Sequence, residues 1–162
     1  MADAPRFEVD AMLVKLARYL RVIGCDATCS PELSLPTRIE RADAEERVFV
    51  TRSRRIEHQE HAPKRMLVLE SEDAVDQLHQ VVAASGIDAT AKLFTRCIRC
   101  NVELAAIAKD ASLAARVPPR VLESYARFWT CPSCATVFWK GSHVSNTCRK
   151  LRLRDAAEDG AV

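Results

Sequence analysis

Residues 7–26 read FEVDAMLVKLARYLRVIGCD, and this stretch decides the fold of the first part of the chain. It opens with a short β-prone run that ends at Asp10, and its apolar residues then fall on one helical stripe until a glycine ends the helix. Lys15, Arg18 and Arg21 fall on the opposite face of that helix. This basic row fits two interpretations equally well: the solvated side of the helix, or a surface that faces phosphates.

Strands and helices continue to alternate after this stretch. The patterns predict further strands over residues 26–29, 48–50 and 66–69, with helices over 37–46 and 71–85. Such alternation is typical of a parallel sheet covered by helices, so we expect a three-layer α/β/α domain over residues 1–90. We expect a smaller metal-binding module over residues 91–150 and a frayed tail over residues 151–162.

Two C-x-x-C pairs mark the smaller module, Cys97 with Cys100 and Cys131 with Cys134. A thiolate pair at this spacing supplies one half of a tetrahedral zinc cage, so the two pairs together predict one closed structural zinc site. Disulfides or chance are the alternatives, and the duplication favours zinc. Because the stretch between the pairs is long, the prediction is a zinc ribbon with a helical insertion.

Composition limits the possible partners and compartments. The chain of 162 residues has a net charge of only +2, so nucleic-acid binding must rest on local basic patches. No apolar run is long enough to cross a bilayer, and acidic residues precede any stretch that could act as a signal, so we expect no membrane association. Because no signal sequence is expected, we expect an intracellular reducing compartment, for which cytoplasm, nucleus and organelle matrix fit equally.

Asp10 and a basic turn are the first candidates for chemistry. Asp10 ends the first strand, where a carboxylate can bind a divalent metal or cap the following helix. Arg52, Arg54 and Arg55 follow the strand at residues 48–50, either as contacts for RNA phosphates or as a solvated loop.

Trp139, Lys140 and His143 form a second candidate surface, on the ribbon. Aromatic rings beside basic side chains suit the stacking of bases of single-stranded RNA. The alternative is that Trp139 packs under the zinc knuckle.

Many blocks of the sequence resemble one known family, in order and in approximate spacing. They are Phe7, Asp10–Leu13, Leu16–Arg18, Leu20–Arg21, Gly24, Asp26, Arg47–Val48, Thr51–Arg52, Phe94, Arg96–Cys97, Cys100–Asn101, Val117–Pro118, Cys131–Pro132, Cys134 and Phe138–His143. The pattern is similar to that of the Mut-seven C-terminal RNase domain family, a branch of the PIN-like nucleases. The resemblance implies a PIN-like α/β/α domain, a zinc ribbon and RNA as the partner.

The resemblance also implies Mg²⁺ or Mn²⁺ at Asp10, because PIN-like nucleases bind such ions with a cluster of carboxylates. This chain departs from the family at two positions of that cluster. Ser53 stands where the family usually has Asp, and residues 34–37 lack the usual acid. A hydroxyl is a weak, neutral ligand, so we expect cleavage to be slow or absent unless another carboxylate substitutes. The candidates are Asp26, which we take as the catalytic partner of Asp10, and Glu32, Glu40, Asp43 and Glu57.

Ser53 therefore separates the functional hypotheses. The first is an RNA-binding protein whose ribonuclease activity is weakened or lost. The others are a structural or adaptor subunit of a ribonucleoprotein complex, an active ribonuclease with a substitute carboxylate, and a protein–protein adaptor that binds no nucleic acid. Ser53 favours the first, with RNA as the partner and ribonucleoprotein or protein partners after it.

Overall fold

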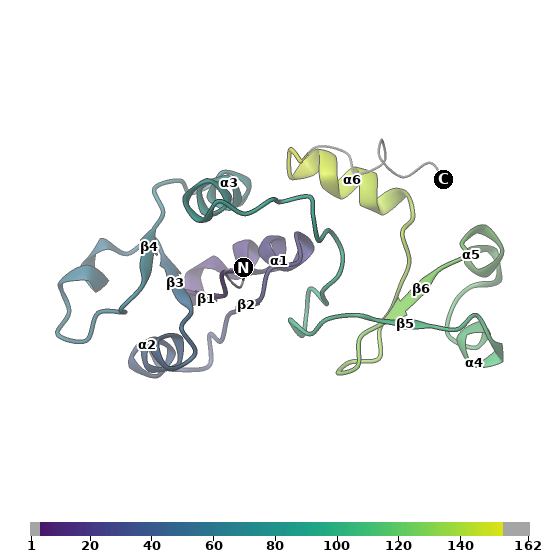
Figure 1. The fold of residues 1–162 in the computed structure, drawn as a ribbon, viewed down its shortest axis with the longest axis horizontal. Helices are drawn as coiled ribbons and strands as arrows, with labels where there is room; N and C mark the ends of the chain where they lie inside the picture. The colour runs from purple at the N-terminus through teal and green to yellow at the C-terminus, as the bar shows by residue number, and fades with distance from the viewer. Residues whose placement is uncertain (1–3, 154–162) are drawn as a thin grey trace.

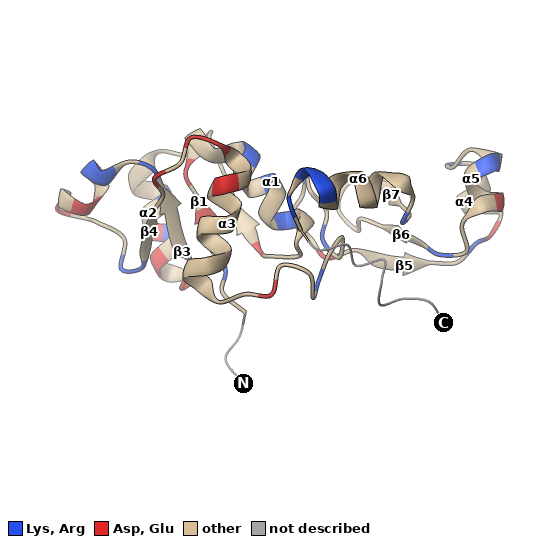
Figure 2. Ribbon diagram, turned by 90° about the horizontal axis from the view of Figure 1, so that it is seen from above, with Lys and Arg blue, Asp and Glu red and all other residues tan. Residues whose placement is uncertain are grey.

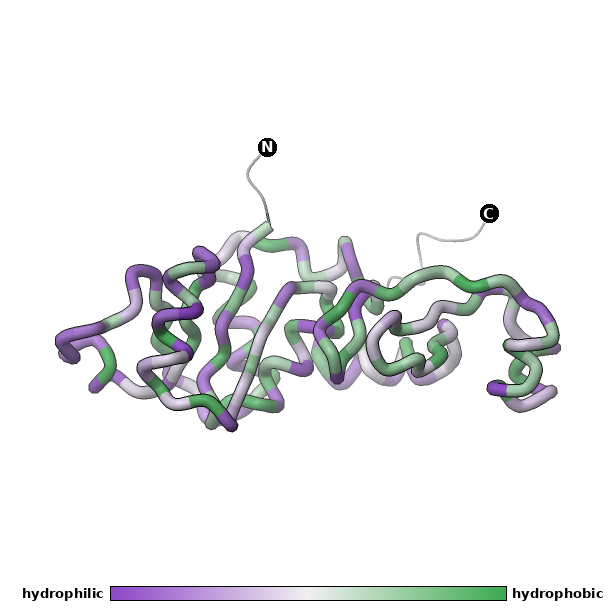
Figure 3. Tube along the Cα trace, turned by 90° about the horizontal axis from the view of Figure 1, so that it is seen from below, coloured by the Kyte–Doolittle hydropathy of each residue, from purple (hydrophilic) through white to green (hydrophobic). Residues whose placement is uncertain are grey.

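A computed structural model describes residues 4–153 of the chain. Figure 1 shows an α/β part at one end of the molecule and an antiparallel ribbon with short helices at the other. The loop between the last two strands of the α/β part, residues 52–65, projects from the end opposite the ribbon and is hydrophilic (Figure 3).

Four parallel strands form the sheet of the α/β part, in the order β2-β1-β3-β4. They are β1 (Phe7–Val9), β2 (Ala27–Thr28), β3 (Val48–Thr51) and β4 (Met66–Val68). The helices are α1 (Val14–Val22), α2 (Leu35–Ala44) and α3 (Ala74–Ser85), with α2 and α3 on opposite sides of the sheet in Figure 1. The predicted parallel α/β sheet is therefore confirmed.

The two faces of the sheet differ in chemistry. Phe7 and Val9 point into the main apolar cluster, which also contains residues of α1 and α3. Because side chains alternate along a strand, Glu8 and Asp10 point to the other face, toward α2. Both carboxylates are buried. Buried carboxylates are costly unless they are paired, so this face requires cations from α2.

The ribbon has three antiparallel strands, β5 (Ala105–Ile107), β6 (Phe128–Thr130) and β7 (Val137–Phe138). The expected helical insertion between β5 and β6 consists of α4 (Ala111–Ala114) and α5 (Pro119–Ser124). These helices pack on β6 through a small cluster around Leu113, Val117 and Phe128.

Helix α6 (Ser142–Lys150) leads from the ribbon back to the α/β part. Its Cys148 and the following Leu151 belong to the main apolar cluster of the α/β part, and Leu151 is fully buried. The tail that the sequence predicts from residue 151 therefore begins with a core residue, and the rest of it, from residue 154 on, lies outside the described residues. Within residues 4–153, no helix combines the length and the apolar character needed to cross a bilayer.

Candidate functional site

The carboxyl ends of β1 and β3 meet where the strand order reverses, since β1 is followed by β2 on one side and has β3 on the other. Open parallel sheets bind ligands at such a point. Asp10 follows β1 directly, and Thr51 is the last residue of β3. Asp10 and Thr51 therefore lie at the point of the sheet where a ligand site is expected.

Asp10 is 5% exposed, and both of its carboxylate oxygens are engaged. Arg38 Nη1 donates to Oδ1 at 2.8 Å, and Thr51 Oγ1 donates to Oδ2 at 2.6 Å. The Asp10 side chain makes no capping hydrogen bond to the turn that follows it, residues Ala11–Leu13. The Asp10 carboxylate is therefore the acceptor of an ion pair rather than a helix cap.

Arg38 reaches Asp10 from α2. This helix begins after Ser34, whose hydroxyl accepts a hydrogen bond from the backbone N–H of Thr37. Its residues Arg38 and Arg41 lie about one turn apart and so share a face. Arg41 Nη2 donates to Glu8 Oε2 at 2.6 Å. Each buried carboxylate of β1 is thus paired with one arginine of α2.

These surroundings do not fit a divalent cation. Mg²⁺ requires a near-octahedral set of oxygen ligands, usually with more than one carboxylate or phosphate. Beside Asp10 stand a guanidinium and a hydroxyl that already donates to it. Ser53 brings no charge, and its backbone N–H donates to Thr51 Oγ1 at 3.0 Å. Among residues 4–153, the cysteines are the only group of three or more potential ligands close enough to share a metal ion.

Asp26 does not join Asp10, contrary to the sequence-based expectation. In the register of β1 and β2, Asp26 lies level with Arg6, and Asp10 comes four residues later, roughly 13 Å along the sheet. Arg47 Nη1 and Asn101 Nδ2 donate to Asp26 Oδ1 at 2.7 and 2.6 Å. Burial alone would raise the pKa of Asp26, but these hydrogen bonds and the charge of Arg47 lower it below its usual value. Asp26 is therefore a structural anion at the amino ends of the strands, whereas Asp10 lies at their carboxyl ends.

The other candidate acids do not complete the site either. Glu32, Glu40 and Glu57 are exposed, and Asp43 accepts a hydrogen bond from the backbone N–H of Lys64 at 2.9 Å. Glu8 is the carboxylate that sequence reasoning missed. The alternation of β1, which puts residues 8 and 10 on one face, was the available signal.

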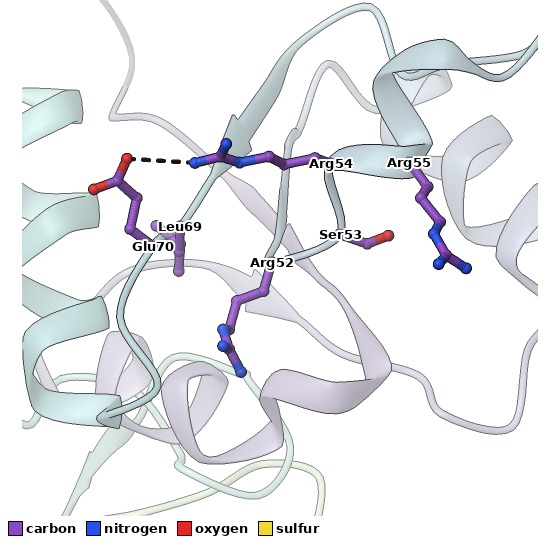
Figure 4. Close-up of a pocket in the computed structure, with 6 residues that line it drawn as sticks. All are labelled: Arg52, Ser53, Arg54, Arg55, Leu69 and Glu70. Carbon is purple, nitrogen blue, oxygen red and sulfur yellow. Dashed lines mark ion pairs between the residues drawn. The ribbon is translucent and has the colours of Figure 1, made fainter.

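The predicted basic turn lines a pocket of about 480 Å³ together with Ser53, Leu69 and Glu70 (Figure 4). Arg52 pairs with Glu72 at 2.8 Å, and Arg54 with Glu70 at 3.7 Å. Arg55 is exposed and makes no ion pair with any described residue. Figure 4 shows Arg52 and Arg55 extending to different sides of the turn. The pocket therefore presents guanidinium groups rather than a carboxylate cluster.

The three basic residues of α1 differ in their surroundings, since two are exposed and one is buried. Lys15 and Arg18 are exposed, and Lys15 lines a cavity of about 280 Å³ with Arg52 and Glu72. Arg21 is buried and structural. Its Nη1 donates to the carbonyl oxygens of Ile98 and Arg99, at 2.9 and 3.0 Å.

The four knuckle cysteines form the second candidate site. Their sulfur atoms lie within 4.8 Å of one another, and Cys97 Sγ is 3.9 Å from Cys134 Sγ. Tetrahedral Zn–S bonds of about 2.3 Å place sulfur atoms about 3.8 Å apart. This group can hold a metal ion such as zinc.

Both knuckles have the same backbone pattern. The N–H of Cys97 donates to the carbonyl of Val102, and that of Asn101 donates back to Cys97. The second knuckle repeats both bonds with Cys131, Thr136 and Ala135. The repeated hydrogen bonds give the two knuckles the same turn, and the four thiols meet between them.

The aromatic surface of the ribbon is partly different from the predicted one. Trp139 packs against Phe128 and His143, with ring centroids 6.5 and 6.1 Å apart, so it lies against the small apolar cluster around Phe128 rather than under the zinc knuckle. Lys140 Nζ instead lies 5.7 Å from the ring centre of Trp129. Together with Tyr125, Ala126 and Arg127 these two residues line a cavity of about 230 Å³. No feature of the sequence indicated that Lys140 would lie over Trp129 rather than beside Trp139.

A parallel α/β sheet with helices on both sides, joined to a ribbon that carries four clustered cysteines, defines the class of this protein. The family model of the Mut7-C RNAse domain matches residues 5–151, so the chain belongs to this nuclease-type family. The resemblance drawn from the sequence blocks is thereby confirmed. Neither the curated proteins nor the solved structures include a significant match.

Proposed function

We propose that this protein binds RNA and that its ribonuclease activity is weakened or lost. One observation carries the proposal: the pocket at the carboxyl ends of β3 and β4 is lined by Arg52, Arg54 and Arg55, together with Ser53, Leu69 and one carboxylate, Glu70. The membership in an RNase domain family supports nucleic acid as the ligand. A pocket of guanidinium groups binds phosphate oxygens without a bridging metal.

The residues near this pocket do not provide the metal site on which cleavage by such nucleases usually depends. Metal ions in nucleases activate water and stabilise the leaving oxygen, and the groups around Asp10 do not fit such an ion. Without it, the arginines can hold and orient a phosphodiester, and the one carboxylate that lines the pocket, Glu70, pairs with Arg54. We therefore propose binding as the function of the site.

The ribbon supports a second contact surface. Lys140, Arg127 and Trp129 combine positive charge with a half-buried indole ring, a combination suited to an unstacked base. Lys and Arg residues are spread over both ends of the molecule (Figure 2). Two separated surfaces suit an extended RNA strand, and they also favour a second candidate, a structural subunit of a ribonucleoprotein complex.

The thiol centre is the cluster of Cys97, Cys100, Cys131 and Cys134. We propose that it binds zinc in a structural role, because all four ligand positions are occupied by cysteines. A thiol centre requires reduced cysteines. An intracellular reducing compartment is therefore part of the proposal.

The experiment that tests the proposal is RNA binding as a function of salt. Fluorescence anisotropy with a labelled single-stranded RNA should give an affinity that falls with salt, and changing Arg52, Arg54 and Arg55 together to Gln should weaken it. If all three contact phosphates, the slope of log affinity against log salt should become less steep by about 2. The matched control changes Lys92, Lys109 and Arg120 to Gln, which removes the same charge away from the pocket. Equal affinity and slope for both triple variants would remove the proposed contact surface.

A further inference from the structure

We infer that the guanidinium of Arg38 takes the place of a divalent cation at Asp10. It thereby excludes metal ions from the carboxyl ends of β1 and β3, where the strand order reverses. The inference concerns cation binding alone, so it goes beyond the proposed function and does not require RNA to be bound. Four features of the structure support it: the charge of Arg38, the hydrogen bonds to the Asp10 carboxylate, the packing of α2 and the position of Ser53.

The first step is charge. The Arg38–Asp10 pair is buried, with side-chain exposures of 8% and 7%, and its opposite charges cancel. A divalent ion at the same carboxylate would stand beside a fixed positive group in surroundings that screen charge poorly. The repulsion disfavours the ion wherever Arg38 stays in place.

The second step is occupancy. Each oxygen of the Asp10 carboxylate already accepts one hydrogen bond, Oδ1 from Arg38 and Oδ2 from Thr51. Arg38 uses Nη1 for this contact, and its buried Nε has no hydrogen-bond partner in the described part of the chain. A metal ion would therefore have to compete with both donors for the remaining lone pairs of the carboxylate.

The third step is rigidity. Arg38 adjoins Ile39, which packs with Ala42, Phe49 and Ile56 under the sheet. Its neighbour on the same helical face, Arg41, is fixed by the fully buried Glu8. The packing of α2 therefore holds Arg38 beside Asp10.

The fourth step is the position of Ser53. Its N–H donates to Thr51 Oγ1, which donates to Asp10 Oδ2, so residue 53 lies one hydrogen-bonded group away from the carboxylate. An acid at this position would reach the neighbourhood of Asp10. Two substitutions, Ser53→Asp and Arg38→Gln, should therefore create a cation site.

The test measures Mn²⁺ binding to the zinc-loaded protein, by the loss of the electron paramagnetic resonance signal of free Mn²⁺. We expect the wild type and both single variants to leave Mn²⁺ free at concentrations that saturate the double variant. The double variant should bind at least about tenfold more tightly, the factor that corresponds to 1.4 kcal/mol. Far-UV circular dichroism and zinc content establish that each variant is folded.

The matched control is Ser53→Asp with Arg41→Gln, which makes the same charge changes but removes the arginine of Glu8. It should not gain Mn²⁺ binding. Wild-type binding that Asp10→Asn abolishes would overturn the inference, and so would a folded double variant that binds no better than the control. If the glutamine variant does not fold, Arg38→Met with Ser53→Asp serves for the same comparison.

Discussion

The side-chain oxygen of Asn101 accepts a hydrogen bond from the backbone N–H of Ala27 at 2.9 Å. Ala27 belongs to β2, the edge strand of the α/β sheet, and its carbonyl oxygen accepts from Arg21 Nε at 2.8 Å. Edge strands expose unpaired backbone groups. In this protein the first metal knuckle and Arg21 satisfy them, so the thiol centre and the sheet edge form one structural unit.

Loss of the metal should therefore affect both parts of the molecule. We expect Cys100→Ala to release zinc and to lower the thermal stability of the whole chain, because the knuckle that covers β2 loses its shape. Zinc content and the melting temperature measure this. Cys25→Ser is the control, since burial raises the pKa of the Cys25 thiol to about 11 and it is no metal ligand. Zinc retained in full by Cys100→Ala would refute the assignment of this ligand.

Asn101→Ala separates the contact with the sheet from the metal. The variant should keep its zinc but lose about 1–3 kcal/mol of unfolding free energy, because the Ala27 N–H loses its acceptor and Asp26 loses one of its donors. Denaturant unfolding together with zinc content tests this. Arg99→Ala is the matched control, since its side chain is exposed and only its carbonyl oxygen contacts Arg21. Equal stability of both variants would show that the contact contributes nothing.

Asp26 should give a pH dependence in acid. Hydrogen bonds from Arg47 and Asn101 overcome the effect of burial and lower its folded pKa, so its contribution to stability is complete above the unfolded pKa of about 3.9. The contribution is lost as the pH falls through the lower, folded pKa. Asp26→Asn should therefore be less stable than the wild type near pH 7, and the difference should shrink below about pH 4. A difference that stays constant from pH 7 to pH 3 would show that Arg47 and Asn101 do not lower the pKa of Asp26.

Arg38→Ala should be strongly destabilising, by about 3–5 kcal/mol, because it leaves the buried Asp10 carboxylate unpaired. Adding Asp10→Asn to it should recover part of the loss, since the unpaired charge is then removed. Denaturant unfolding of the two single variants and the double variant gives the coupling energy of the pair. Coupling close to zero would mean that the two side chains do not share an ion pair in solution.

The sequence predicts the architecture well because its signals are local. Alternating strand and helix patterns predict the parallel sheet, and the spacing of Cys97, Cys100, Cys131 and Cys134 predicts their cluster. The strand and helix patterns, and each C-x-x-C pair by itself, rest on residues close together in the chain.

The candidate site is less predictable because it depends on contacts across elements. Arg38 lies on a polar helix and looks solvated in the sequence, and only the packing of α2 on β1 brings it to Asp10. Asp26 precedes its strand, whereas Asp10 follows its own. Because the two strands are parallel, the two acids lie at opposite ends of the strands. A candidate acid must therefore be placed by strand direction as well as by proximity in the sequence.

The central claim is that RNA is bound without being cleaved at the Asp10 site. The most direct measurement follows a labelled mixture of single-stranded and hairpin RNA with the purified protein in Mn²⁺ or Mg²⁺, with Asp10→Asn in parallel. We predict a salt-dependent complex and intact RNA for both proteins. Cleavage by the wild type that Asp10→Asn abolishes would contradict this claim and identify a working nuclease.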